Sequence, residues 1–469
     1  MSELPEGWAE TSFMDVFDIQ GGTQPPKSVF KYEPTEGYIR LLQIRDFGDK
    51  PLPTYIPNKD SLKRCVEDDV LIGRYGASVG RICTGMNGAY NVALAKVVVP
   101  QILDKRFVFH FLKSELFQRP ILDIERSAQD GFNKEDLSEI PLLLPPLNEQ
   151  RRIVAKLEKL LSRVDAARAR LATIPRIVKR FRQSVLAAAC SGRLTTDWRN
   201  SNETDELDDL PSGWKRVLVE DLLPKGGIFD GPFGSNLKTS DYTPSGVRVI
   251  RLENIGQLKF NEDKETYVSQ EKYQMLIRHT VREGDIIFAS FITDEVRACV
   301  LPPIKTKAIA KADCFCLRPL EDLVNPTFLT YQLISQETFN SFIDNIHGAT
   351  RPRINTTQLR RLVVRVCSLA EQQEIVRRVE ALFKTADALE ARYRTAKAHV
   401  DKLTQSILAR AFRGELVTTE AELARREGRD YEPASVLLER IRQERAQQVA
   451  PKQKTKRASK RDLNSQTHR

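Results

Sequence analysis

The residues of this sequence that could carry out a reaction do not fall in the spacing that a catalytic motif requires. The sequence contains no GxxxxGK(S/T) phosphate loop, no HExxH pair of metal-binding histidines and no GxSxG nucleophile turn. The tetrapeptide Asn325–Phe328 resembles the Asn-Pro-Pro-Phe/Tyr pocket of adenine methyltransferases, but it lacks the second proline and no glycine-rich cofactor loop precedes it. We therefore interpret it as a strand-to-helix turn.

The glycines and histidines also lack the spacing of a cofactor-binding or catalytic motif. Gly226, Gly227, Gly231 and Gly234 lie in GGIFDGPFGSN, without the GxGxxG spacing that holds a pyrophosphate. The five histidines are scattered along the chain, and each is better explained as a structural residue. We expect no catalytic residue, no metal and no cofactor in this chain, so any activity would come from partner chains.

Length and composition predict an ordinary globular protein. A chain of 469 residues suggests two to four domains, and shares of 41% hydrophobic and 29% charged residues are typical of soluble proteins. No apolar run approaches the roughly 20 residues of a membrane span, and the first residues form no signal peptide. Seven cysteines without a CxxC pair argue against a disulfide framework or a zinc site, and Cys314 and Cys316 should share one face of a strand. We expect buried reduced thiols and a cytoplasmic location.

Most of the net charge lies in the C-terminal tail. Residues 447–469 contribute +6 of the formal net charge of +10, so the rest of the chain is only mildly basic. A charged tail is more often a disordered end than a specific site. Charge alone makes nucleic-acid binding plausible and no more.

The strongest feature of the sequence is an internal repeat. Residues 149–196 align without a gap to residues 371–418, with 20 identities in 48 positions. Upstream, shorter matches keep their order with a drifting offset: LPEGW with LPSGW, Ile39-Arg40-Leu41 with Ile250-Arg251-Leu252, EDDVLI with EGDIIF, and FNKEDL with INTTQL. A constant offset indicates a rigid element, and a drifting offset indicates insertions between matching strands. Each half of the chain is therefore a variable domain followed by a fixed module.

The fixed module is predicted to be a long helix. Apolar residues recur with spacings of 4, 3, 4, 3 and 4 in both copies, a stripe that needs a partner helix to bury it. The alternative is two unrelated helices with solvated faces, and the ungapped repeat disfavours it. The simplest arrangement packs the two stripes antiparallel, and about 43 helical residues would form a spacer roughly 65 Å long. The stripe comprises Ile153, Leu157, Leu160, Val164, Ala167 and Leu171 in one copy and Ile375, Val379, Leu382, Ala386, Leu389 and Tyr393 in the other.

Local signals predict where these helices begin and end. Ser368 with Glu371 forms a capping box at one start, and Asn148 can cap the other. Gly192 and Gly414 are stop signals at equivalent positions. Pro175 interrupts only the first copy and should kink that helix or divide it in two.

We therefore predict an α+β protein with pseudo-twofold symmetry, in which two mixed α/β domains are joined by a long antiparallel two-helix coiled coil. The predicted segments are a first variable domain at 1–145, a helical spacer at 146–196, a linker at 197–209, a second variable domain at 210–367, a second spacer at 368–418, and a basic, partly disordered tail at 419–469 with a short helix near 433–446. That helix is expected to pack on the coiled coil, with contact to a modification subunit as the alternative.

This organisation resembles the specificity subunits of type I restriction–modification enzymes. The resemblance runs from Leu4 to about Thr418 and rests on LPEGW and LPSGW, DDVLIGRYGASVG, IPLLLPPLNEQRRIV, RFRQSVLAAACSGRLT and LTQSILARAFRGELV, in that order and duplication. One departure is Val366-Cys367-Ser368-Leu369, where the family usually has a Pro-Pro turn. It puts in doubt only how the second helix begins.

The resemblance implies a non-catalytic DNA-binding subunit that reads the two halves of a split, asymmetric site in double-stranded DNA. It further implies two modification subunits, which bind S-adenosylmethionine, methylate adenine and dock on the helical stripe, and two restriction subunits, which use ATP and Mg²⁺. Such a complex methylates adenine N6 and cleaves DNA as an ATP-dependent endonuclease. A spacer of fixed length agrees with this, because it would fix the separation of the two half-sites.

Bases are read by side-chain donors and acceptors on loops, which rigid strands hold in place. Each candidate loop could equally be an ordinary Gly/Pro turn, and an arginine there could read guanine or merely hold a phosphate. The candidate DNA-binding residues are Thr23, Gln24, Lys27, Arg74, Tyr75 and Ser78 in the first domain and Ser235, Asn236, Lys238, Ser290, Thr293, Arg351 and Arg353 in the second.

Two other functions remain open at the level of sequence. One is a self-contained DNA-modifying enzyme whose motifs have diverged beyond recognition, and the other is a coiled-coil scaffold that binds only proteins. Methylation by the isolated chain would favour the first. Failure to retain DNA together with a modification subunit would favour the second.

Overall fold

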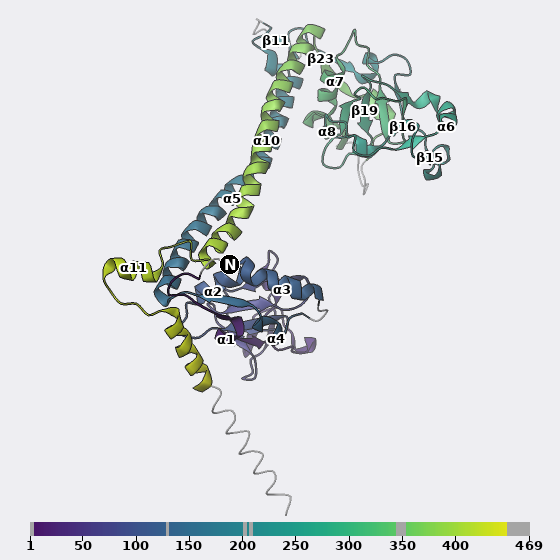
Figure 1. The fold of residues 1–469 in the computed structure, drawn as a ribbon. Helices are drawn as coiled ribbons and strands as arrows, with labels where there is room; N and C mark the ends of the chain where they lie inside the picture. Colours follow the sequence, from purple (N-terminus) through teal and green to yellow (C-terminus); the bar gives the residue numbers. More distant parts are fainter. Residues whose placement is uncertain (1–3, 128–130, 200–203, 206–209, 344–352, 448–469) are drawn as a thin grey trace, which may run out of the picture. The chain divides into compact units, whose positions relative to one another are not determined.

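The structure, a computed structural model, divides into two compact units. Unit 1 comprises residues 1–171 and 396–469, and unit 2 comprises residues 172–395. Each unit is therefore built from one variable domain, part of the helix that follows it and part of the other long helix (Figure 1). The structure describes residues 4–127, 131–199, 204–205, 210–343 and 353–447.

The variable domain of unit 1 contains two four-stranded sheets. One is antiparallel throughout, with strand order β2-β9-β6-β7, and the other, β4-β3-β8-β5, contains one parallel pair, β3 with β8. A third pair, β1 with β10, joins the beginning of the domain to its end. The strands are β1 Ala9–Ser12, β2 Asp18–Gly21, β3 Tyr38–Leu42, β4 Tyr55–Pro57, β5 Arg64–Cys65, β6 Val70–Gly73, β7 Ile82–Cys83, β8 Gly88–Tyr90, β9 Leu94–Val98 and β10 Pro141–Leu144, and the helices are α1 Phe13–Val16, α2 Lys105–Leu112, α3 Glu115–Ser127 and α4 Lys134–Ser138.

The variable domain of unit 2 has the same strand order with one addition. Its sheets run β14-β22-β19-β20 and β15-β17-β16-β21-β18, and β15 has no counterpart in the described part of unit 1. The extra strand and helix α6 belong to the part of this domain shown at its outer edge in Figure 1. The strands are β13 Lys215–Leu218, β14 Ile228–Phe229, β15 Tyr242–Thr243, β16 Val247–Ile250, β17 Tyr267–Val268, β18 Thr280–Val281, β19 Ile286–Ala289, β20 Ala298–Val300, β21 Ala308–Ala310, β22 Cys314–Leu317 and β23 Val363–Val366, preceded by the small pair β11 Thr204–Asp205 and β12 Leu210–Pro211; the helices are α6 Gln270–Met275, α7 Pro326–Leu333, α8 Gln336–Ile343 and α9 Thr356–Arg360.

The sheet register corrects one of the sequence matches. In the parallel pairs, Leu42 lies opposite Tyr90 in unit 1 and Ile250 lies opposite Ala310 in unit 2. Both strands then turn into a short 3₁₀ helix. Ile250 therefore corresponds to Leu42 and not to Ile39, so the alignment of the two Ile-Arg-Leu triplets is wrong by three residues. Short apolar strands look alike at several registers, and only the neighbouring strand decides which one is used.

The two long helices are α5 (Leu147–Cys190) and α10 (Leu369–Phe412), each of 44 residues. They run antiparallel: in unit 1 the Arg168 guanidinium lies 3.6 Å from the Asp401 carboxylate, and in unit 2 Arg182 lies 2.6 Å from Asp387. Arg182 follows Arg168 in α5 by the same number of residues by which Asp387 precedes Asp401 in α10, so the register of the two helices is constant. The predicted coiled coil is confirmed.

Three local predictions about these helices need correction. Helix α5 continues through Pro175, so of the two expected outcomes, a kink or a division, the division is wrong; a proline removes one backbone hydrogen bond, and its neighbours keep the helix intact. Helix α5 begins at Leu147, so Asn148 is not its cap. Ser368 does accept a hydrogen bond from the Glu371 N–H, 3.3 Å, but the Glu371 side chain is used elsewhere. Gly192 and Gly414 follow the helix ends in the left-handed conformation, with φ of 74° and 77°, as predicted.

Each long helix begins by binding the tryptophan that opens its variable domain. In unit 1 the Trp8 indole N–H donates to Glu149, 2.8 Å, and in unit 2 Trp214 donates to Glu371, 3.1 Å. The next residue, Gln150 or Gln372, donates its amide to the carbonyl of the residue five positions earlier, over 2.9 and 2.8 Å. In each unit the repeated Glu-Gln pair therefore connects the variable domain to the long helix that follows it.

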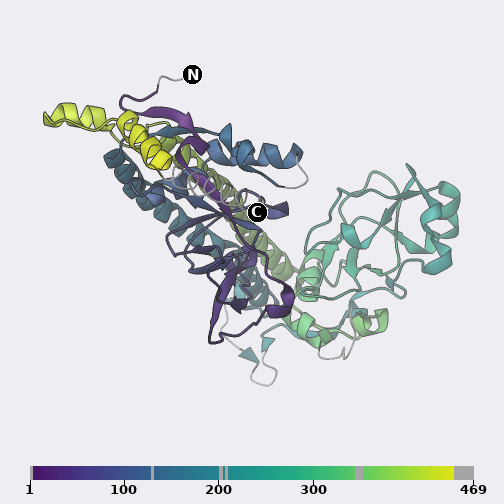
Figure 2. The same ribbon diagram turned by 90° about the horizontal axis from the view of Figure 1, so that it is seen from below.

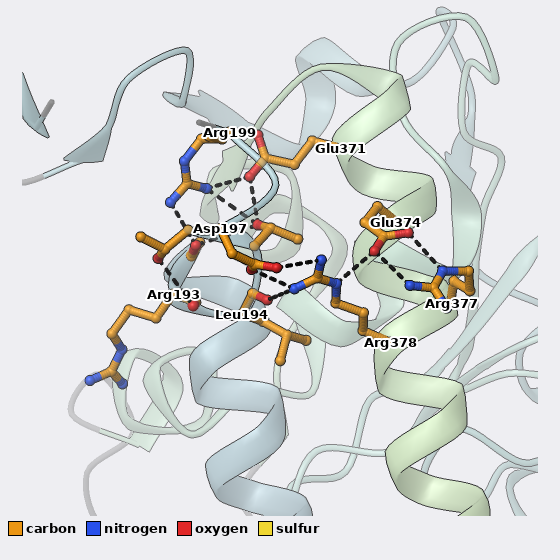
Figure 3. A network of polar contacts seen from close by, with 11 residues as sticks. Arg193, Leu194, Asp197, Arg199, Glu371, Glu374, Arg377 and Arg378 are labelled. Atoms are coloured by element: carbon orange, nitrogen blue, oxygen red, sulfur yellow. Dashed lines mark hydrogen bonds and ion pairs between the residues drawn. The ribbon is translucent and has the colours of Figure 1, made fainter. Parts of the chain in front are cut away.

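In each unit a further segment of the chain also donates hydrogen bonds to this glutamate. In unit 2, Glu371 also accepts from Thr195, 2.7 Å, and from Arg199, both after the end of α5, while Arg378 binds Asp197 (Figure 3). In unit 1 the equivalent glutamate, Glu149, accepts from the Glu420 N–H, 2.7 Å, at the start of helix α11 (Glu420–Glu427).

The chain after α11 belongs to the core of unit 1. A helix beginning at residue 434, described through residue 447, buries Ala434, Leu437, Leu438 and Ile441 in the same core as Trp8. The Ala434 N–H donates to the Gly7 carbonyl, 2.8 Å. This part of the chain is shown in yellow beside the purple N-terminal strand in Figure 2. A helix therefore lies where one was expected near 433–446, and its hydrogen bond to Gly7 joins it to the beginning of the chain.

Candidate nucleic-acid interface

In the first domain the predicted loops meet beside the carboxyl end of β8. The Thr23 N–H donates to the Tyr90 carbonyl, 3.1 Å, and the Arg74 N–H donates to the Ala93 carbonyl, 2.9 Å. Gly22 allows this approach, because a Cβ there would lie 2.1 Å from the Asn91 carbonyl oxygen. The loop after β2, the loop after β6 and the turn after β8 therefore form one surface.

Three buried polar atoms at this surface lack a hydrogen-bond partner in the described part of the chain. They are Thr23 Oγ1, Arg74 Nε and Asn91 Oδ1. A buried polar group without a partner is costly, so such groups indicate where a ligand or water binds. These three atoms include one donor and acceptors that a bound water or a ligand group could satisfy.

The other predicted residues of the first domain lie around this surface. Gln24, Lys27 and Tyr75 are exposed. The Ser78 hydroxyl instead donates to the Tyr75 carbonyl, 2.7 Å, and so holds the turn after β6 together. Ser78 is thus better explained as a structural residue of the loop.

In the second domain the equivalent surface is more polar. The Ser290 N–H donates to the Asp313 carbonyl, 2.9 Å, as Arg74 donates to Ala93 in the first domain. The Ser290 hydroxyl also donates to the Asp313 carboxylate, 3.1 Å, and Arg353 forms an ion pair of 2.5 Å with the same carboxylate. Two of the predicted residues, Ser290 and Arg353, are therefore brought together by a third that was not predicted.

Two aromatic rings hold the Arg353 guanidinium. Its central carbon lies 5.4 Å from the ring centre of Phe233 and 5.8 Å from that of Phe291. Beneath it, Asp230 accepts from the Asp313 N–H, 2.9 Å. Burial raises the pKa of Asp230 to about 6, against the hydrogen bonds from Gly231 and Asp313 that lower it.

The remaining predicted residues of the second domain do not join this cluster directly. Ser235 and Asn236 lie in the 3₁₀ turn Gly234–Asn236 that follows Phe233, and Asn236, Lys238 and Thr293 are exposed. Arg351 lies outside the described residues. The surface is thus formed around Ser290 and Arg353, with the other candidates at its edge.

Sequence reasoning missed the turn that precedes β9 and β22. It carries Asn91 in the first domain and Lys311 and Asp313 in the second, and Asp313 has a φ of 71°, which is rare for a residue other than glycine. Lys311 and Arg251 lie 5.5 and 5.8 Å from the ring centre of Tyr242, on the additional strand. The repeat could have identified this turn, because Asn91-Val-Ala93 and Lys311-Ala-Asp313 both precede a matched strand.

The predicted coiled-coil residues lie mostly in the seam. The exception is Leu389, whose exposed fraction of 47% places it on the outer surface of the helix pair in unit 2. Ile153, Leu157, Val164, Ile375, Val379 and Ala386 are buried, and Leu160, Ala167, Leu171, Leu382 and Tyr393 are half-buried.

Comparison with known families and proteins agrees with this architecture. The family described as the type I restriction modification DNA specificity domain matches residues 5–176 and again residues 212–397. These two matches cover most of the chain, so the protein belongs to this family. It is a specificity subunit of the type I restriction–modification class.

Individual relatives extend over nearly the whole chain. The EcoKI specificity subunit of Escherichia coli K12 is 29% identical, covering 95% of this chain and 97% of its own length. The StySPI specificity subunit of Salmonella potsdam is 30% identical, covering 97% and 99%.

Solved structures share the fold. A chain from a structure of a type I R-M system superposes with a TM-score of 0.66 at 20% identity, covering 88% of this chain and all of that one. The HsdS subunit of Thermoanaerobacter tengcongensis gives a TM-score of 0.53 at 20% identity, covering 88% and 98%. Within the described ranges, no helix is both long and apolar enough to cross a membrane.

Proposed function

We propose that each variable domain reads one half of a split, asymmetric site in double-stranded DNA, and that the surface around Arg74 and the surface around Arg353 make the base contacts. One observation carries this proposal. Two domains with the same strand order present different side chains at equivalent loop positions, such as Arg74 against Ser290 and Ala93 against Asp313. Two half-sites that differ in base sequence require two domains that share a scaffold but differ in the residues that contact DNA.

The helices supply the connection between the two readers. α5 and α10 are each continuous over 44 residues, and the same antiparallel register is kept in both units. We propose that they fix how many base pairs lie unread between the half-sites, and that two modification subunits dock on them. The exposed apolar residues Ile177, Phe181 and Leu389 on the helix pair of unit 2 support a docking role.

The chemistry is proposed to reside in partner subunits. The chain itself is non-catalytic, the modification subunits use S-adenosylmethionine to methylate adenine, and two restriction subunits use ATP and Mg²⁺ for cleavage. The whole complex would act in the cytoplasm. This division of labour is supported by the absence of catalytic motifs from the sequence.

The test is a map of methylated adenines in cells that produce this chain together with a modification subunit. We expect methylation confined to one split motif with a constant number of unspecified base pairs between its halves. The isolated chain should give none. Methylation by the chain alone, or methylation without a split motif, would show that the proposal is wrong.

A further inference from the structure

Each candidate surface contains an arginine close to aromatic rings, and the two arginines come from positions of the chain that are not equivalent. In the first domain Arg74 lies 5.1 Å from the Tyr75 ring centre and 5.9 Å from that of Phe132. In the second domain the residue equivalent to Arg74 is Ser290, and the stacked arginine is Arg353. Because FNKEDL of the first domain matches INTTQL of the second, the residue equivalent to Arg353 is Gly131.

In the first domain the backbone excludes an arginine at the position equivalent to Arg353. A Cβ at Gly131 would lie 2.1 Å from the Arg74 carbonyl oxygen, and Gly131 has a φ of +77°, so no larger side chain fits opposite Arg74. In the second domain an isolated β-bridge pairs Phe291 with Arg353, and Arg353 does not have the positive φ of Gly131, so the backbone there accepts an arginine. Each domain thus places one guanidinium between aromatic rings, and each leaves the opposite position small.

The charges around Arg353 favour a base over a phosphate. The Asp313 carboxylate touches the guanidinium, and the Asp230 carboxylate accepts from the Asp313 backbone. The Asp313 carboxylate offsets the positive charge of the guanidinium and would repel a phosphate placed against it. Arginine is the usual partner of guanine O6 and N7, and a carboxylate accepts from the amino group of cytosine.

The guanidinium is also held in one orientation. Two rings, at 5.4 and 5.8 Å, and one carboxylate, at 2.5 Å, restrict it, while 42% of the side chain remains exposed to a partner. A planar guanidinium that is already held in place before binding loses little conformational entropy when it donates two parallel hydrogen bonds. Such restraint suits a base edge, where both donors must align.

We infer that Arg353 reads a guanine in the major groove of the second half-site, with Asp313 as the residue that positions it. The inference rests on the proposed function and adds to it the chemical identity of one base pair. It predicts that the methylated motif contains a G·C pair in that half.

The experiment maps methylated adenines for the full chain produced with its modification subunit. Arg353→Gln should lose discrimination at one G·C position by roughly ten- to a hundredfold and keep every other position of the motif. Arg353→Lys should relax the same position, because an ammonium cannot bind two acceptors in parallel. Asp313→Asn, which keeps an acceptor for Ser290 and tolerates a positive φ, should relax it in part. The matched control is Arg365→Gln in β23, whose guanidinium pairs with Glu337, 2.7 Å, and which should leave the motif unchanged.

Several other outcomes would overturn the inference. An unchanged motif in Arg353→Gln does so, and so does a uniform fall in methylation that Arg353→Lys restores, because that pattern identifies a phosphate contact. If Arg353→Gln abolishes methylation, Arg353→Lys decides: a relaxed position supports the inference and a wild-type motif overturns it. A wild-type chain without any split motif would instead refute the proposed function itself.

Discussion

Glu149 and Glu371 show how one residue type can fasten a domain to a helix. Both carboxylates are buried, and each accepts the indole N–H of the tryptophan that opens its domain. In unit 1 burial raises the pKa of Glu149, against the hydrogen bonds from Glu420 and Trp8 that lower it. A buried carboxylate depends on such partners, because each one that is lost leaves part of its desolvation cost uncompensated.

We therefore expect Trp8→Phe and Trp214→Phe to destabilise unit 1 and unit 2, respectively, by about 1–3 kcal/mol. Phenylalanine keeps an aromatic ring but lacks the indole N–H and is smaller than indole, so the loss combines the hydrogen bond to the glutamate with some packing. Hydrogen exchange followed by mass spectrometry reports each unit separately. The matched control is Trp198→Phe, at a side chain that is 40% exposed, which should change neither unit; an equal loss in the control would refute the role of the hydrogen bond.

Asp230 gives a prediction whose sign depends on pH. Its folded-state pKa, about 6, lies above the ordinary value of 3.8, so the folded state binds the proton more tightly than the unfolded state. The buried charge therefore weakens unit 2 above pH 6, and the weakening is relieved as the pH falls from 6 towards 4.

Asp230→Asn should stabilise unit 2 at pH 7.5 by about 1 kcal/mol, after allowance for solvent screening, because the amide oxygen keeps the acceptor for Gly231 and Asp313. At pH 4.5 the gain should disappear. Urea unfolding at the two pH values measures it, and a gain that is the same at both would contradict the assignment.

At the scale of elements, the ends of the long helices meet the beginning of a domain. Gly192 follows α5, and a Cβ on it would lie 2.8 Å from the Pro211 ring and 2.9 Å from that of Trp214. Gly414 follows α10 in the same way, and a Cβ on it would lie 2.5 Å from Pro5. These glycines allow helix end and domain start to pack closely as well as permitting the left-handed turn.

Gly192→Ala should therefore cost more stability than Gly213→Ala, although both residues have a φ between 74° and 79°. A Cβ at Gly213 meets nothing within 4 Å, so its replacement measures backbone strain alone, about 1 kcal/mol. Thermal unfolding of the two variants gives the comparison. Equal losses would show that the close approach to Pro211 and Trp214 contributes nothing.

Pro175 is an interruption that α5 accommodates. Pro175→Ala restores one backbone N–H within a continuous helix and should slow hydrogen exchange in the turns around it. The equivalent residue in α10 is Lys397, and Lys397→Pro should destabilise that helix by about 3 kcal/mol. If Pro175→Ala accelerates hydrogen exchange, the prediction is wrong and the proline stabilises α5 at this position.

At the scale of the whole molecule, the chain beyond α10 completes unit 1. A chain that ends at residue 433 loses Ala434, Leu437, Leu438 and Ile441 from a core they share with Trp8. We expect unit 1 to lose several kcal/mol, since each large buried side chain contributes about 2–5 kcal/mol, while unit 2 keeps its stability. Calorimetry should then resolve two transitions. A chain that ends at residue 447 is the control and should melt like the full protein.

The sequence predicted those parts of the molecule that a pattern can specify. The heptad stripe from Ile153 onward and the ungapped repeat of residues 149–196 predicted two antiparallel helices, because helical periodicity and a constant offset leave few alternatives. Glu371 was interpreted as half of a capping box, whereas it binds Trp214 from 157 residues away. Similarly, the partnership of Arg353 with Asp313 arises from sheet pairing between distant strands, and no local spacing reveals it.

The different origin of the two stacked arginines restricts how either surface could have arisen from the other. An arginine at position 131 would meet the backbone carbonyl of residue 74, which is present whatever side chain stands there, and a backbone with a positive φ that suits glycine. Giving the first surface the arginine of the second therefore requires a change of backbone as well as of side chain. Single substitutions at these two equivalent positions do not turn one surface into a copy of the other.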